Sequence, residues 1–248
     1  MSLTSSAAVC QATPEDKPFD FVALPLEVKE LIYKHAMFAG GYFDSAIFGG
    51  SNLFRADRLC KHLPAICFTN KLERIIACRI YLRYKTVNVV GDSDPPALQA
   101  FLSQLGQANE GLEWLKYVCF GHFGGGSNVS RNAIDLIKVC TALKTVVFHI
   151  RSADLYQLHE LKSEKTRLST GPEILERLNL HGLVDCGHLA KVRFGVLYGR
   201  YIDMGGMKSM MKGFSRAFSE VHGPTAANRL DLSIEDEYGV IWVLKPQT

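Results

Sequence analysis

No Cys-x-x-Cys pair occurs in this sequence, although it contains seven cysteines. That absence removes the commonest spacing of zinc-binding and thiol-redox motifs, and the odd count does not fit a complete disulfide framework. Most of the cysteines lie inside apolar runs, where a thiol behaves as a small hydrophobic side chain. We interpret them as reduced core residues, which indicates a cytoplasmic or nuclear protein. They are Cys10, Cys60, Cys67, Cys78, Cys119, Cys140 and Cys186.

The sequence also lacks a long apolar run, a basic N-terminal region and a strong net charge. No run approaches the ~18 uninterrupted apolar residues of a membrane-spanning helix, so no membrane association is expected. Residues 1–18 have neither the basic start nor the apolar stretch of a secretory signal, and we interpret them as a disordered tail. The formal net charge of +3 is too small to indicate a nucleic-acid partner.

No stretch carries a specific catalytic or cofactor-binding signature. Gly124, Gly125, Gly126 and Ser127 lie between an expected strand and an expected helix, as phosphate-binding turns do. A P-loop, however, would continue with Lys and Ser or Thr, which are missing here. A turn between two structural units is the simpler interpretation, and no cofactor is expected.

Two histidines at the ends of expected strands define an alternative ligand site. His122 and His149 occupy similar places in two strands, and ligands of open parallel sheets bind beyond the carboxyl ends of the strands. In an enzyme either imidazole would act as an acid or a base there, but no nucleophile or carboxylate pair accompanies them. The alternative function is therefore an enzyme or a ligand-binding protein that uses this rim, formed by His122, Gly124–Gly126 and His149.

A second group of metal-ligand residue types is His181, Asp185, Cys186 and His188. Their spacing matches no tetrahedral metal site, so no metal is expected. Polar residues that cap the end of a helix are the simpler interpretation of this group.

Three copies of the spacing Leu-x-x-Val-x-Phe organise the middle of the chain. The copies begin at Leu115, Leu143 and Leu189, and a looser copy begins at Tyr84. The first intervals, from position 84 to 115 and from 115 to 143, are 31 and 28 residues, which is typical of helix-plus-strand stacks such as leucine-rich repeats. Because one such unit cannot cover its own apolar face, we expect the copies to lie side by side as parallel strands, backed by the preceding helices.

The expected fold class is therefore α/β, with a mostly parallel sheet. A helical segment over residues 19–84 is followed, over 85–248, by an irregular stack of helix–strand units that packs with it as one unit. The other expected elements are a loop (42–57), helices (63–84, 96–106, 172–183 and 205–222), a helix capped by Ser130, a helix fragment with a loop (151–170) and a closing hairpin (229–234 with 240–244).

The first helix, within residues 19–38, has two apolar faces. Val28, Leu31, Ile32 and Ala36 form one stripe at helical spacing, and a second line is offset from it. A surface helix needs only one such face. The second face therefore indicates either full burial, which is the commoner outcome in a domain of this size, or a surface kept for a partner. The second line consists of Leu26, Tyr33 and Met37.

The same helix begins with Leu-Pro-x-Glu-Val, and a Leu-Pro-Ala-Ile sequence follows at residues 63–66. With residues 79–87, these segments resemble the F-box-like domain that is common in fungal proteins of unassigned function. The chain departs from the family pattern where Ile75-Ile76 replaces a Glu-Ala pair and where no proline precedes Ile80. The residues of the first helix that carry the resemblance are Phe21, Leu24, Pro25, Glu27, Val28, Leu31, Ile32 and Tyr33.

The resemblance implies that the first helix docks on the adaptor subunit of a cullin-type ubiquitin ligase. The expected contact residues are Leu24, Pro25, Leu26, Tyr33 and Met37, since a helix face laid in a partner's groove is a known recognition mode. The expected function is a protein-interaction module, acting as a substrate-recognition adaptor of such a ligase rather than as an enzyme. A scaffold without a ligase link and the ligand-binding rim are the alternatives.

Overall fold

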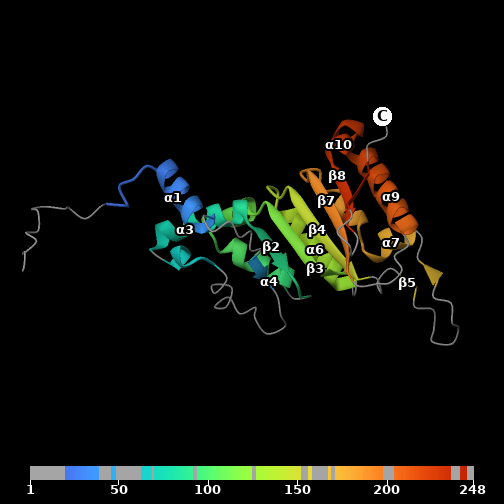
Figure 1. The fold of residues 1–248 in the computed structure, drawn as a ribbon, viewed down its shortest axis with the longest axis horizontal. Coiled ribbons are helices and arrows are strands. Elements are labelled where there is room, and N and C mark those ends of the chain that lie inside the picture. Colours follow the sequence, from blue (N-terminus) through green and yellow to red (C-terminus); the bar gives the residue numbers. More distant parts are fainter. Residues whose placement is uncertain are drawn as a thin grey trace, which may run out of the picture.

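Eleven ranges of the chain are described by the structure, which is a computed structural model (Figure 1). The expected tail over residues 1–18 lies outside them. The described residues are 20–38, 46–48, 63–68, 70–91, 94–124, 127–151, 156–157, 167–168, 171–197, 204–235 and 241–244.

Within these ranges, seven strands form one sheet, in the order β1-β2-β3-β4-β7-β8-β9. All neighbouring pairs are parallel except β8 and β9, which are antiparallel. The α/β class, the mostly parallel sheet and the C-terminal antiparallel pair are therefore confirmed. The strands are β1 (Ala46–Phe48), β2 (Thr86–Val89), β3 (Tyr117–Phe123), β4 (Thr145–Arg151), β7 (Lys191–Leu197), β8 (Asp231–Glu235) and β9 (Ile241–Leu244).

The three Leu-x-x-Val-x-Phe copies lie side by side in this sheet, as predicted. In β3, β4 and β7 the valines pair in register as Val118, Val146 and Val192. The phenylalanines of the same strands pair in the same way, and their rings stack: Phe148 lies 5.5 Å from Phe120 and 5.6 Å from Phe194, measured between ring centroids. Because the same positions repeat in each strand, identical side chains meet across the ladder.

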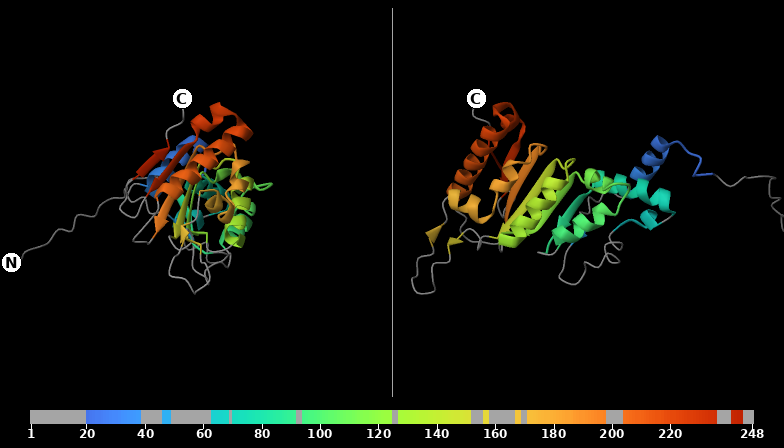
Figure 2. Two further views of the ribbon diagram at one scale, coloured as in Figure 1. Left: turned by 90° about the vertical axis from the view of Figure 1, so that its right-hand side faces the viewer. Right: turned by 180° about the vertical axis from the view of Figure 1, so that it is seen from behind.

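Helices precede the strands and cover one face of the sheet, as Figure 2 shows. Side chains alternate between the helix-covered face, which is buried, and the opposite face, which is half-buried in β4. The helices are α1 (Leu26–Phe38), the 3₁₀ turn η2 (Ala65–Phe68), α3 (Lys71–Tyr84), α4 (Asp94–Ser103), α5 (Glu110–Trp114), α6 (Ser127–Val139), α7 (Gly171–Arg177), α8 (His181–Val184), α9 (Met204–His222) and α10 (Pro224–Arg229).

One large hydrophobic core lies between the helices and the sheet, and it includes residues from Leu63 to Ile234. The methionine-rich face of α9 is part of it, so its expected role in the core is confirmed. That face consists of Met207, Met210, Met211, Phe214 and Phe218, all of which are buried. In contrast, α1 contributes to a second, smaller cluster around Tyr33.

Several expected elements are wrong in detail. Residues 46–48 form strand β1 within a stretch expected as a loop, because a strand of three residues is too short to show a periodic pattern. The expected helix over 172–183 is divided into α7 and α8 at Asn179, whose φ of 53° ends a right-handed helix. Ser130 does not cap α6, which already begins at Ser127.

The segment between β4 and α7 also differs from expectation. Instead of a helix fragment, the described part contains β5 (Tyr156–Gln157) and β6 (Arg167–Leu168), which pair in antiparallel fashion. The short helices α5 and α10 were not predicted, because they have only five and six residues.

Candidate functional site

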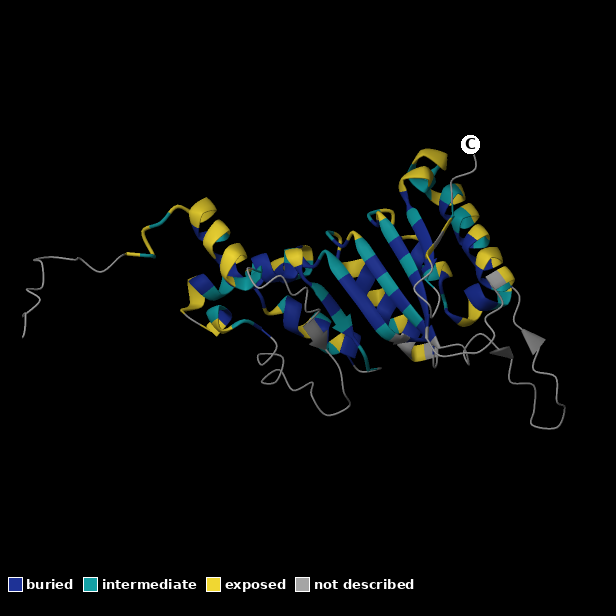
Figure 3. Cartoon of the chain, in the orientation of Figure 1, coloured by how far each residue is buried: buried dark blue, intermediate teal, exposed yellow. Residues whose placement is uncertain are grey.

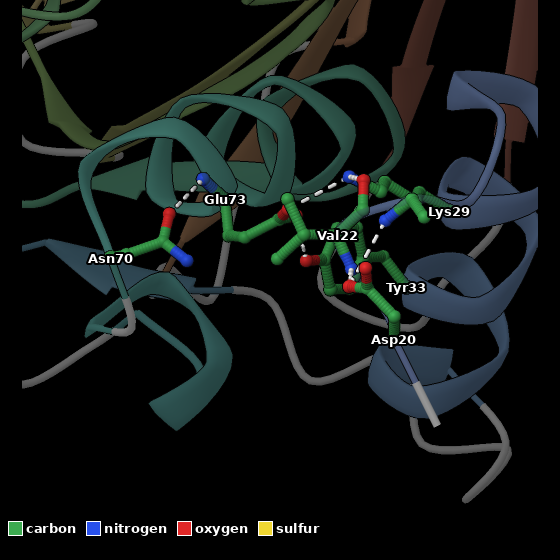
Figure 4. A network of polar contacts seen from close by, with 7 residues as sticks. Asp20, Val22, Lys29, Tyr33, Asn70 and Glu73 are labelled. Carbon is green, nitrogen blue, oxygen red and sulfur yellow. Dashed lines mark hydrogen bonds and ion pairs between the residues drawn. The ribbon is translucent and has the colours of Figure 1, made fainter. Parts of the chain in front are cut away.

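The first helix is attached to α3 through a buried polar network. Lys29 donates from Nζ to Oε1 of Glu73 at 2.9 Å and to the carbonyl oxygen of Val22 at 2.8 Å. The hydroxyl of Tyr33 donates to Oε2 of the same carboxylate. Figure 4 shows these side chains converging between the two helices. The ammonium and both carboxylate oxygens are thereby hydrogen-bonded, as a buried ion pair requires.

Short-range contacts place the backbone at both ends of this network. Oδ1 of Asn70 accepts a hydrogen bond from the backbone N–H of Glu73 at 3.0 Å, which caps the N-terminus of α3. Oδ1 of Asp20 accepts from the N–H groups of Val22 and Ala23, in a turn that leads into α1 (Figure 4). The carboxylate and the carbonyl acceptor of Lys29 are therefore each held by their own segment.

Protonation of the network follows from these contacts. Burial raises the pKa of the Glu73 carboxyl. Hydrogen bonds from Tyr33 and Lys29, together with the charge of Lys29, lower it by a larger amount, so the pKa lies below its usual value. Burial and the neighbouring carboxylate raise the pKa of the Tyr33 phenol. At neutral pH Glu73 is therefore charged and Tyr33 is a hydrogen-bond donor.

The inward-facing side of α1 is narrow. Lys29, Tyr33 and Met37 follow one another at a spacing of four residues, which places them on one line of the helix. Tyr33 packs against Ile76 and Ile80 of α3, in the cluster that is separate from the main core. The rest of the helix circumference is not covered by these contacts.

The opposite side of α1, which we call the outer face, is apolar and exposed. Leu31 is 67% exposed, and Figure 3 shows most of the helix surface in the exposed class. Contiguous exposed apolar surface of this kind is typical of interaction sites. The large apolar residues of the outer face are Val28, Leu31 and Ile32, and Leu26 and Val22 are also exposed near the start of the helix.

Full burial of both faces of α1, the commoner outcome expected from the sequence, does not occur, and the two faces differ in exposure. Of the expected contact residues, Tyr33 is buried against Glu73 and is not available to a partner. Leu24 and Met37 are half-buried, whereas Pro25 and Leu26 are exposed. The stripe expected to face the interior is instead the exposed one. The physical reason is that the buried carboxylate of Glu73 pairs with Lys29, so the side of α1 that carries Lys29 faces α3.

A groove of about 310 Å³ lies between α1 and α3 beside the outer face. Leu31 from α1 and Ile80 and Tyr84 from α3 supply its apolar part. Three charged residues of α1, Glu27, Glu30 and Lys34, complete the lining. The groove and the outer face share Leu31 and form one continuous candidate surface.

The alternative rim is described only in part. Gly124 is buried and has a φ of 118°, a conformation that favours glycine. Gly125 and Gly126 lie outside the described residues, and the side chain of His122 does as well. The rim expected from the sequence therefore lies partly outside the described residues.

His149 lies on the face of the sheet that the helices leave uncovered. Both of its ring nitrogens lie 4.0 Å from Sγ of Cys119 on β3. On the other side the ring lies over Gly195 of β7, where a Cβ atom would approach Cδ2 of the imidazole to 2.7 Å. Burial raises the pKa of Cys119 to about 11, so this thiol is protonated at neutral pH and is a poor nucleophile.

The residues considered as metal ligands lie in different environments. Asp185 forms an ion pair with Lys138 at 2.9 Å, and burial raises the pKa of Cys186 to about 11. His181 is exposed, whereas His188 is half-buried and burial lowers its pKa. Across the described part of the chain, no group of three or more His, Cys, Asp and Glu side chains is arranged to hold a metal ion.

Comparison with known protein families finds no match, and neither do comparisons with curated proteins and with solved structures. Among the helices in the described ranges, none combines the length and apolar character that a membrane crossing requires.

The sequence prediction missed the two charged residues that orient the candidate surface. Lys29 and Glu73 each look like solvated charges on an amphipathic helix, and 44 positions separate them in the sequence. The one local signal is the line of Lys29, Tyr33 and Met37, in which a lysine shares a face with two large apolar side chains.

Proposed function

We propose that this chain is a protein-interaction module that docks on a partner protein through the outer face of α1. The observation that carries the proposal is the exposure of Leu31 and its apolar neighbours on a helix whose other side is locked to α3. Full burial of a Leu, Ile or Val side chain contributes about 1.5–3 kcal/mol relative to its exposure. Three such side chains on one helix face, Val28, Leu31 and Ile32, supply a useful part of a binding free energy.

The charged residues around this face support a protein partner. Glu27 and Glu30 are acidic and Lys34 is basic, so the rim of the apolar surface has both signs of charge. An apolar centre with a mixed polar rim is the composition that protein interfaces show. An anionic membrane or a nucleic acid would instead select a mainly basic rim.

The partner that we propose is the adaptor subunit of a cullin-type ubiquitin ligase. This choice comes from the resemblance of the Leu-Pro-x-Glu-Val helix to F-box-like domains. In this proposal α1 docks on the adaptor, and the stacked helix–strand units, an irregular form of a leucine-rich-repeat arrangement, provide the surface that recognises a substrate. Repeated helix–strand units offer such extended surfaces.

A pull-down with the purified adaptor subunit tests the proposal. The wild-type chain is compared with Leu31→Asp, which places a charge at the centre of the outer face. Val221→Asp is the matched control, because Val221 is 57% exposed on α9 and belongs to a different surface. Wild type and Val221→Asp are expected to retain the adaptor, and Leu31→Asp is expected to lose it.

Circular dichroism confirms that each variant is folded. Retention of the adaptor by folded Leu31→Asp, or no retention by folded wild type, would contradict the proposal.

A further inference from the structure

The groove between α1 and α3 has an ordered arrangement of charge around its apolar floor. Glu27, Leu31 and Lys34 follow one another along one line of α1, at helical spacings of four and three residues. Seven residues of helix span roughly 10 Å, so the carboxylate and the ammonium lie about two turns apart. Leu31 lies between them, next to the side chains of Ile80 and Tyr84.

Two of the three charged residues at the groove already make contacts with α3. Oε1 of Glu30 accepts a hydrogen bond from Arg79 of α3 at 2.5 Å, which neutralises that carboxylate. Nζ of Lys34 lies 4.4 Å from the ring centroid of Tyr84, which holds the ammonium at one end of the groove. Within the described residues, Glu27 forms no ion pair, and its carboxylate remains for a partner.

From this arrangement we infer that the groove receives an amphipathic helix of the partner that carries a basic residue opposite Glu27 and an acidic residue opposite Lys34. An aliphatic side chain between these two residues enters the groove beside Leu31. A helix fits because the two charges on the chain are separated by a distance that two turns of a second helix match. This inference rests on the proposed docking role of α1 and adds the chemistry of the segment that docks.

Both signs of charge are needed for this recognition. A segment with basic residues at both positions would meet repulsion from Lys34, and a segment with acidic residues at both would meet repulsion from Glu27. Exposed pairs of this kind contribute little to affinity, but they select between related partners. The apolar anchor supplies most of the binding free energy, and the charges determine which helix is accepted.

Two synthetic helical peptides test the inference against the full chain. Each has about 15 residues and a hydrocarbon staple, because an unstapled helix of this length is marginal in water. Both have the same aliphatic face. One carries Arg and Glu seven positions apart, and the other carries Glu at both positions. Since a helix can dock in either direction, a peptide with the two charges exchanged would not discriminate.

Affinities are measured by fluorescence anisotropy for the wild-type chain and for Glu27→Lys, in which both ends of the groove are basic. Wild type is expected to prefer the Arg/Glu peptide by roughly twofold to fivefold, and Glu27→Lys is expected to prefer the Glu/Glu peptide by a similar factor. Leu31→Asp is expected to bind neither peptide. Equal affinity of both peptides for both chains, or no binding of either peptide to wild type up to about 1 mM, would overturn the inference.

The outcome is separable from the test of the proposed function. Adaptor binding that depends on Leu31, with no exchange of peptide preference in Glu27→Lys, would leave the docking role intact and remove the charge rule. An exchange of preference without adaptor binding would keep the groove specificity and remove the adaptor as its partner.

Discussion

Nζ of Lys29 lies 2.9 Å from Oε1 of Glu73, and the two side chains are only 5% and 4% exposed. Apolar residues occupy two faces of α1, so hydrophobic burial alone does not distinguish these faces strongly. The ion pair does, because any other rotation of α1 would leave Glu73 buried without its cation. The pair therefore turns Val28, Leu31 and Ile32 outward, and the proposed docking surface depends on it.

Loss of one partner of this pair should be costly. Lys29→Met leaves the carboxylate of Glu73 buried without a positive charge, and we expect a loss of about 3–5 kcal/mol in the free energy that holds α1 on α3. Hydrogen–deuterium exchange of the α1 amides measures the loss within α1. Urea unfolding measures how much of it appears in the unfolding free energy of the whole chain. Lys212→Met, at an exposed position of α9, is the control and should change stability by no more than about 0.5 kcal/mol. Unchanged protection of α1 in Lys29→Met would show that the pair does not fix the helix.

Stability should depend on pH through Glu73. Its pKa in the folded chain lies below the usual value of about 4.3, so its charged form adds stability above that pH. This contribution decreases as the pH falls through the folded pKa. Urea unfolding from about pH 7 to pH 3 should therefore show a difference between wild type and Glu73→Gln that is largest at neutral pH and shrinks below about pH 4. A difference that grows in acid would mean that the folded pKa is raised.

The stacked phenylalanines should dominate the stability of the sheet. Phe148 is fully buried between Phe120 and Phe194, and Phe148→Ala is expected to cost about 3–5 kcal/mol of unfolding free energy. Val147→Ala, the adjacent position on the half-buried face, is the control and should cost less. Denaturant unfolding of both variants measures the difference. Equal costs at positions 147 and 148 would contradict the placement of the core on the helix-covered face.

The stability cost of replacing Gly195 should depend on the side chain of His149. A Cβ atom at position 195 would lie 2.7 Å from Cδ2 of His149, so Gly195→Ala forces the imidazole to shift, at a cost of about 1–3 kcal/mol. The same substitution in a His149→Ala background should be nearly neutral. A double-mutant cycle of unfolding free energies measures this coupling. Additive effects of the two substitutions would show that the ring does not lie over Gly195.

The repeated sequence pattern was sufficient to predict the central strands of the sheet, and the reason lies in its period. Val118, Val146 and Val192 recur at one position of each unit, so the strands that contain them stack in register. Strand β1 was missed because three residues within a stretch rich in glycine and aromatics show no alternation. The break at Asn179 was missed because it depends on one left-handed residue rather than on hydrophobic spacing.

The orientation of α1 was not predictable in the same way. Its two apolar faces have nearly equal weight in the sequence, and the choice between them depends on a carboxylate of another helix. Glu73 carries no local signal of burial, and the only one for Lys29 is the line that it shares with Tyr33 and Met37. A long-range pair of this kind becomes visible only when α1 and α3 are placed together.

Thiol labelling of Leu31→Cys tests the central claim most directly. The rate of maleimide labelling at position 31 is measured by peptide mass spectrometry, in the free chain and with the adaptor subunit at about ten times its dissociation constant. Ile241→Cys, on the exposed edge strand β9, is the control. The account predicts fast labelling of Leu31→Cys in the free chain, slowed about tenfold by the adaptor, with no change at position 241. Slow labelling in the free chain, or a rate at position 31 that the adaptor leaves unchanged, would contradict it.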